Sequence, residues 1–273
     1  MTIAKTNLVN TFTGYVKDLN SKIKTVKSEI ASGQNTLTSD QQATVTSLSA
    51  TIKSYSTPQA SITAAQNTIS VAQKAIASIL PIMNQMQQLA AQASNTSIGS
   101  SDSMNMNFRF QQLFTQIGKL ATSAGLNGTN LLSGTAGMNV ITGTDKTATS
   151  RSYVNSVNVY GMMTMGLLSN IKVDSPDNAR AAMSALQSAI AQINNGQSTL
   201  KITSAKLATQ ATTLNGLASD SQKTIDTLQK ADIVKLSAKL TQLQNEQNVD
   251  YQLISQLDPT AYKTLKILSL TTS

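Results

Sequence analysis

Apolar side chains recur at intervals of seven along two long stretches of the chain, one in each half. In the first half the two series begin at Ile62 and Ala65, and in the second half they begin at Met183 and Leu186. Apolar residues at the first and fourth places of a seven-residue repeat form a narrow stripe on a helix, which another helix must cover. The pattern predicts a mainly α fold in which long antiparallel helices form a coiled coil. The residues expected in this seam are Ile62, Ile69, Ile76, Ile79, Met83, Met86, Met183, Leu186, Ile190, Ile193, Leu200, Leu207 and Leu214.

Two further stripes lie toward the ends of the chain. Residues 3–30 have their own interval of seven, and Gly33 can take the left-handed conformation that ends a helix. The register slips near Lys230 to Asp232, which indicates a change of packing partner, and a last stripe runs through 233–270. We expect a single chain to leave these stripes incompletely buried, with their partners largely on neighbouring copies. The residues expected on this surface are Val9, Phe12, Val16, Leu19, Ile23, Val26, Ile30, Ile233, Leu236, Leu240, Leu243, Ile254 and Leu257.

Local signals indicate where the inner helices begin and break. A helix through roughly 41–97 contains two prolines. Pro58 either interrupts this helix or, with Thr57 as the cap, occupies the first turn of a new one. At Pro81 the stripe continues without a change of phase, so a kink is expected there. Ser101 and Asp102 can cap a shorter helix. Its expected core residues are Phe108, Leu113, Ile117 and Leu120.

The character of the sequence changes at Leu126. Asn-Gly, Ser-Gly, Ala-Gly and Thr-Gly dipeptides alternate with short runs of alternating polarity, such as the one from Tyr153 to Val159. These features predict hairpins in a small β-containing knob at about 126–174. Ser175-Pro176-Asp177 then begins the long back helix, with a capping hydroxyl, a first-turn proline and an acid at the positive helix end.

Composition narrows the class of protein. Only 40% of the residues are apolar and 4% are aromatic, values that suit thin seams between helices more than a deep core. The chain has neither cysteine nor histidine. It therefore lacks thiolate and imidazole ligands and the usual general base, and we expect no metal site, no cofactor and no enzymatic activity.

The net charge of +8 raises the question of a polyanionic partner. The basic residues are mostly scattered singly, and no aromatic residues alternate with them, so a solvated basic face is favoured over a nucleic-acid site. The N-terminal segment lacks the apolar core and cleavage site of a conventional secretory signal. No apolar run approaches the ~20 residues that span a bilayer. The chain is expected to be either cytoplasmic or exported by a route that uses no cleaved signal.

Several segments, taken in order, resemble bacterial flagellins. Ser32-Gly33 followed by Ile69 to Gln73 is similar to the family's SSG and GISIAQ pair, at nearly the family's spacing. Gln88 to Ala93 resembles the ELAVQA stretch, and Leu126 to Ser133 resembles the FNGxxLL turn that opens the hairpins. The segment from Ala231 to Gln244 is similar to the C-terminal helix. The order and spacing of these segments are more specific than any one of them.

The resemblance implies a filament subunit with a flagellin-like D0/D1 arrangement. It places a terminal-helix domain (D0-like) with its connector at 1–40 and 231–273, and a helical core domain (D1-like) at 41–230. It implies self-assembly into a swimming filament outside the cell, type III export without a cleaved signal, and an export chaperone, cap and hook-filament junction proteins as partners. Two alternatives are a hook-filament junction protein and a flagellin-like surface protein that binds acidic polysaccharide.

The chain departs from the family in places. The connector from Glu29 to Ala43 has no arginine, and the end from Leu265 to Leu270 differs from the family's SLL-type end. Innate immune recognition of flagellins uses arginines in a stretch where this chain has Gln85 and Gln87. The resemblance therefore implies that these two positions evade that receptor.

Overall fold

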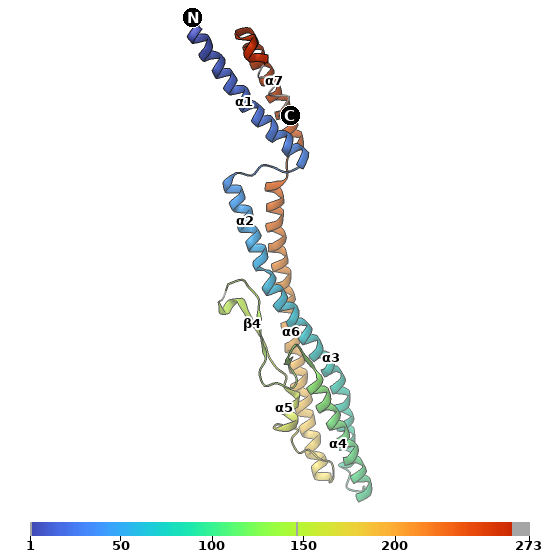
Figure 1. The fold of residues 1–273 in the computed structure, drawn as a ribbon. Coiled ribbons are helices and arrows are strands. Elements are labelled where there is room, and N and C mark those ends of the chain that lie inside the picture. The colour runs from blue at the N-terminus through green and yellow to red at the C-terminus, as the bar shows by residue number, and fades with distance from the viewer. Residues whose placement is uncertain (1, 146, 264–273) are drawn as a thin grey trace. The chain divides into compact units, whose positions relative to one another are not determined.

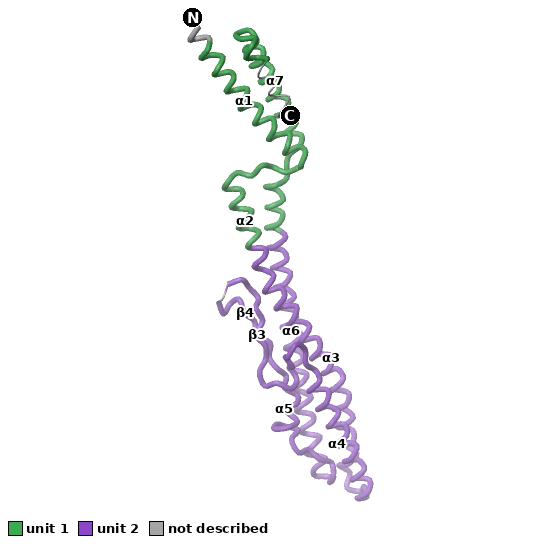
Figure 2. The backbone as a smooth tube through the Cα atoms, viewed as in Figure 1, with its two compact units in different colours: residues 1–50, 220–273 green, residues 51–219 purple. Residues whose placement is uncertain are grey.

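The computed structural model describes residues 2–145 and 147–263, with side chains from Thr6 onward. Long helices dominate these residues, and the strands form two short antiparallel pairs (Figure 1). The expected mainly α fold with a small hairpin region is confirmed. The chain divides into two compact units, residues 1–50 with 220–273 (unit 1) and residues 51–219 (unit 2) (Figure 2). These divisions fall within α2 (Ser39–Ser54) and α6 (Pro176–Gln229) rather than at the expected 40 and 231.

In unit 1, α1 (Thr2–Ser32) packs antiparallel to α7 (Ile233–Leu257) (Figure 1). α1 ends where the sequence indicated, because Gly33 has a φ of +67° and its N–H bonds to the Glu29 carbonyl at 2.9 Å. α7 begins after the register slip, with the Asp232 carboxylate accepting a 3.0 Å hydrogen bond from the Lys235 N–H. The break between α6 and α7 therefore has a specific cap.

Two connectors in unit 1 are joined to each other by backbone hydrogen bonds. The Asn35 N–H donates to the Gln229 carbonyl at 2.7 Å, and the Ala231 N–H donates to the Gly33 carbonyl at 3.0 Å. The Asn35 side-chain amide also donates to the carbonyls of Leu228 and Lys230. These bonds satisfy backbone groups at two helix ends, so the ends of α1 and α6 are held together.

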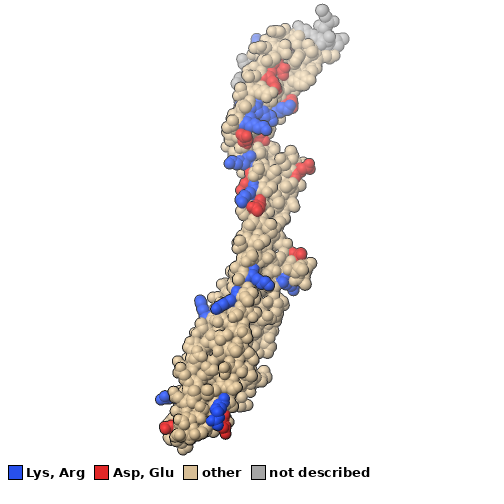
Figure 3. All heavy atoms as spheres, turned by 180° about the vertical axis from the view of Figure 1, so that it is seen from behind, with Lys and Arg blue, Asp and Glu red and all other residues tan. Residues whose placement is uncertain are grey.

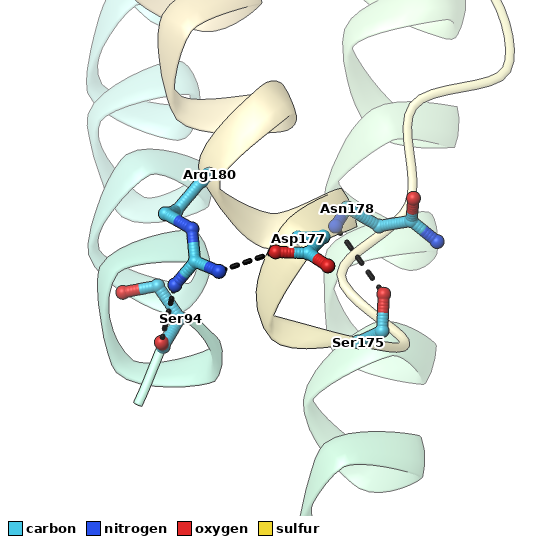
Figure 4. A network of polar contacts seen from close by, with 5 residues as sticks. All are labelled: Ser94, Ser175, Asp177, Asn178 and Arg180. Carbon is cyan, nitrogen blue, oxygen red and sulfur yellow. Dashed lines mark hydrogen bonds and ion pairs between the residues drawn. The ribbon is translucent and has the colours of Figure 1, made fainter. Parts of the chain in front are cut away.

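In unit 2, buried side chains of α3 (Ser56–Ala93), α4 (Ser100–Ser123) and α6 form one core. α3 and α6 run antiparallel, since Gln59 donates a 2.6 Å hydrogen bond to Asn215 near one end and Arg180 donates to the Ser94 carbonyl near the other. α6 begins as expected, with the Ser175 hydroxyl accepting from the Asn178 N–H at 3.2 Å and Arg180 paired with Asp177 (Figure 4).

Three expectations about the inner helices were wrong in detail. The helix breaks at Tyr55, and Thr57 lies inside α3 rather than capping it, while Pro58 does occupy the first turn. α4 is capped by Gly99, so Ser101 and Asp102 lie within its first turn. Phe108 is 65% exposed, and Phe110, two residues further on, is fully buried instead. Pro81 lies within α3, which continues past it.

The knob contains two hairpins. β1 (Gly125–Leu126) and β2 (Thr129–Asn130) flank Asn127 and Gly128, whose positive φ values of 51° and 78° suit a tight hairpin turn. β3 (Met138–Ile141) pairs with β4 (Arg151–Val154), and the 3₁₀ turn η1 (Ala148–Ser150) precedes β4. The strand expected through Val159 was wrong beyond Val154, because Val159 begins the short helix α5 (Val159–Thr164).

Hydrogen bonds tie the second hairpin to the long helices of unit 2. The Ile141 N–H donates to the Ser61 hydroxyl of α3 at 2.9 Å. The side-chain amide of Gln210, on α6, donates to the Thr142 carbonyl at 2.9 Å. The knob is thus seated on the coiled coil by specific polar contacts as well as by buried Val140 and Val154.

Candidate assembly surface

The α1–α7 pair brings the predicted terminal residues together. Val16 and Ile254 are fully buried in one cluster, and Leu19, Ile23, Val26 and Leu243 form a second. Asn20 of α1 also accepts a hydrogen bond from Gln247 of α7. The two stripes therefore cover each other in part within one chain, and the expectation of partners on other copies stays a prediction. The partial cover arises from antiparallel pairing, which sets each stripe against the other within the chain.

Burial along the pair is nevertheless incomplete. Val9 is buried, and Ile233 is exposed. The stripe at 264–270, including the end from Leu265 to Leu270, lies outside the described residues. Five predicted residues remain only half-buried: Phe12, Ile30, Leu236, Leu240 and Leu257. Half-buried apolar side chains in the two terminal helices leave apolar surface that association could still remove from water.

One flank of the pair is hollowed into a groove of about 890 Å³, here called the α1–α7 groove. Phe12, Tyr15 and Leu19 line it from α1, and Val249 lines it from α7. Tyr15 is 57% exposed and Val249 is 54% exposed. The groove therefore presents large apolar groups outside the predicted stripes.

Charged groups also line this groove. They are Asp18 and Lys22 from α1, and Glu246 and Asp250 from α7. The Lys22 ammonium group forms a 2.6 Å ion pair with Asp18. The hydrogen bond to Asp18 is the main cause that raises the pKa of Lys22, and the negative charges of Asp18 and Glu246 raise it further. Burial, and then the neighbouring negative charge of Glu246, raises the pKa of Asp250. Three carboxylates thus share the groove with one ammonium group.

The predicted inner seam lies in the core of unit 2. On α3 all six predicted residues are fully or almost fully buried, and on α6 five of the seven are buried. Met183 and Ile190 are half-buried and pack at the edge of the same core. These residues hold the subunit together and are not part of the candidate assembly surface.

The two predicted receptor positions lie on α3. Gln85 is exposed, and Gln87 is half-buried. Gln85 and Gln88 line a second groove of about 400 Å³ between α3 and α4, together with Arg109 and Gln112 of α4. Uncharged amides dominate this groove, and Arg109 supplies its charge.

The sequence did not indicate some of the side chains that line the α1–α7 groove. Tyr15 and Val249 lie off the seven-residue stripes, so periodicity gave no reason to select them. The acidic character of the groove arises only when α1 and α7 pair, because Asp18 is more than 220 residues from Glu246 in sequence. The groove could be identified only from the structure of the paired helices, because both helices line it.

The described part of the chain holds neither a candidate metal site nor a candidate membrane span. Among the described residues, no group of three acidic side chains is arranged to hold a metal ion. In the same part of the chain, no helix is both long enough and apolar enough to cross a membrane.

Comparison with known proteins points to one family. Residues 4–137 match the bacterial flagellin N-terminal helical region. The chain is 26% identical over 200 residues to flagellin FlaB1 of Treponema pallidum, which covers 68% of this chain and 70% of that protein. It is 26% identical over 179 residues to flagellin FljK of Caulobacter vibrioides, covering 65% of this chain and 64% of that protein.

A solved structure is also similar. The crystal structure of Bacillus cereus flagellin is 20% identical, covers 57% of this chain and 88% of that chain, and gives a TM-score of 0.49. The N-terminal match and the flagellin relatives agree with the segment-by-segment resemblance found in the sequence. Together, the N-terminal match and these relatives support a bacterial flagellin.

Proposed function

We propose that the chain is the structural subunit of a bacterial flagellar filament, which serves swimming motility outside the cell. One observation carries the proposal: in a chain similar to bacterial flagellins, the α1–α7 pair leaves five stripe residues half-buried. Self-association would bury these residues further. The chain acts through polymerisation, and we propose no catalytic role for it.

The energetics favour cooperative assembly. Each ~100 Å² of apolar surface that a neighbouring copy covers contributes about 2.5 kcal/mol. Docking two copies also costs several kcal/mol in lost translational and rotational freedom. A copy that meets one neighbour gains little above this cost, whereas a copy that meets several gains much more. Assembly should therefore show a critical concentration below which the chain stays monomeric.

A buried-charge variant tests the role of the terminal pair. Val16→Asp places a carboxylate where the native side chain is fully buried, and such a group without a partner is strongly unfavourable. We expect this variant to keep the helical signal of unit 2 but to stay in the supernatant after sedimentation. Val234→Asp, the same substitution at an 83% exposed position of α7 outside the stripes, is the matched control and should polymerise. Filaments of normal yield from Val16→Asp would refute the assignment.

The same assay separates the alternatives. A hook-filament junction protein does not need to form long polymers of itself, so long filaments of the pure chain favour the filament subunit. A surface protein that binds acidic polysaccharide would bind such a polymer in a salt-dependent way without needing to assemble. No observation in the structure favours either alternative.

Further partners follow from the similarity to flagellins alone. We propose that a flagellar export chaperone, a filament cap and hook-filament junction proteins interact with this chain, and that it is exported without a cleaved signal. The first of these is tested by co-purification of the full chain with the chaperone encoded by the same organism. Loss of that complex on removal of α7 would locate the binding region.

We also propose that Gln85 and Gln87 reduce recognition by the innate immune receptor for flagellins. The support is that Gln85 is exposed on α3 and that neither side chain carries the positive charge expected there. Monomeric protein should give a weak response in a receptor reporter-cell assay. A double Gln85→Arg and Gln87→Arg variant should raise the response. A strong response from the native chain would contradict the proposal.

A further inference from the structure

The α1–α7 groove has a charge opposite to that of the chain as a whole. The chain carries +8, but the groove holds three carboxylates and one ammonium group. Lys22 is already bonded to Asp18. Among the described residues, no cation lies within 4.0 Å of Glu246 or Asp250. Among the residues that the structure describes, the groove therefore presents apolar groups beside two carboxylates that no ion pair neutralises.

A second surface of unit 1 has the complementary charge. Lys17 and Lys24 are exposed on α1, and no carboxylate lies within 4.0 Å of either among the described residues. They are seven residues apart, so they share a face of the helix and lie about 10 Å apart along it. Lys17 and Asp18 are adjacent in sequence and point about 100° apart around the helix, so this lysine face differs from the groove side. Figure 3 shows groups of both signs along the helices of unit 1.

Two different complementary surfaces on one subunit have a consequence for symmetry. An interface that joins unlike surfaces is heterologous, and it continues from copy to copy as an open helix when the rotation does not close a ring. An acidic groove and a basic face on the same helix pair are suited to this arrangement. Two like grooves facing each other would instead bring carboxylates together.

We propose that the α1–α7 groove of one copy receives the lysine face of α1 from the next copy. Lys17 and Lys24 pair with Glu246 and Asp250, while Tyr15 and Val249 pack against the incoming helix. The inference rests on the proposed function, since it identifies which surfaces of the subunit meet. The partner is a second copy of this chain, because the chain itself supplies both halves of the match.

Charge reversal with rescue tests the pairing. Glu246→Lys and Lys24→Glu, each alone, place like charges together and should raise the critical concentration for polymerisation about tenfold. The double variant restores opposite charges across the interface and should return to within about twofold of the native value. Lys201→Glu, at an exposed position of α6 in unit 2, changes the net charge as Lys24→Glu does and serves as the control. Circular dichroism checks that each variant keeps its helices.

Cysteine cross-linking gives a second readout that does not depend on charge. The native chain has no cysteine, so introduced thiols report only the designed pair. Filaments co-assembled from Lys24→Cys and Glu246→Cys chains should form a disulfide-linked dimer on mild oxidation. Filaments of either variant alone, and co-assemblies of Lys201→Cys with Glu246→Cys, should not. Absence of the dimer from intact mixed filaments overturns the proposal.

The outcomes separate this inference from the proposed function. If the native chain polymerises but the double variant assembles no better than the single variants, the pairing is wrong and the filament assignment stands. An equal effect of Lys201→Glu means that net charge alone acts, and the pairing is again wrong. If the native chain never polymerises, the proposed function itself fails.

Discussion

Gly196 of α6 is a point where the knob approaches the long helix so closely that a methyl group does not fit. A Cβ added at Gly196 would lie 2.8 Å from Val157 Cγ1 and 2.9 Å from Val157 Cγ2. Val157 cannot retreat easily, because its N–H bonds to the Leu131 carbonyl at 2.8 Å. Gly216, on the same helix and also preceded by asparagine, has no atom within 4 Å of such a Cβ. The two glycines therefore separate helix propensity from packing.

Replacing each glycine with alanine should change stability in opposite directions. Gly216→Ala gains the full preference of a helix for alanine, about 1 kcal/mol. Gly196→Ala gains the same amount but forces overpacking against Val157, which costs about 1–3 kcal/mol. We expect a net loss of about 1 kcal/mol at Gly196, so the two variants should differ by about 2 kcal/mol.

Urea unfolding of the monomeric chain, followed by circular dichroism, measures this difference. Adding Val157→Ala to Gly196→Ala should recover part of the loss, since the two side chains are in contact and their effects are not additive. If Gly196→Ala stabilises the chain as much as Gly216→Ala does, the close contact between Val157 of the knob and Gly196 of α6 is incorrect.

Three further predictions concern single side chains. Phe110→Ala should destabilise the subunit by about 3–5 kcal/mol because the ring is fully buried, whereas Phe108→Ala should change unfolding in urea by less than about 0.5 kcal/mol; equal losses would contradict the assigned face of α4. The Tyr251 hydroxyl is buried with no hydrogen-bond partner among the described residues, so Tyr251→Phe should stabilise the chain by about 1 kcal/mol, and a clear loss of stability would reveal a partner. Burial and the charge of Glu246 raise the pKa of Asp250 in the folded chain. Ionised Asp250 therefore destabilises the α1–α7 pair at pH values above this raised pKa. The destabilisation is absent at pH values below the pKa of Asp250 in the unfolded chain. Asp250→Asn should therefore raise the melting temperature at pH 7 and leave it unchanged near pH 3, while a decrease at pH 7 would show that the carboxylate is stabilising.

Features that depend on local chemistry could be predicted from the sequence. Gly33 ends α1 because a left-handed residue costs glycine little, and Ser175-Pro176 begins α6 because a capping hydroxyl and a fixed φ suit a first turn. The seam residues from Ile62 to Met86 are buried because an interval of seven keeps them on one side of α3. Each of these signals lies within a few turns of a single helix.

Features that depend on neighbouring elements could not be predicted. α4 is short and packs on α3 and the knob, so it lacks a long repeat that could show Phe110 rather than Phe108 as the buried ring. The α1–α7 groove combines residues from the two terminal helices, so its charge and apolar lining depend on pairing that periodicity does not specify.

The central claim is that terminal helices of neighbouring copies make the contacts that build a filament. Helical reconstruction by electron cryomicroscopy of the polymerised native chain tests it most directly. We predict filaments in which α1 and α7 of adjacent copies contact each other through the stripe residues that are half-buried in the single chain. A sample that forms no filaments at high concentration, or filaments in which these residues face solvent, would contradict the claim.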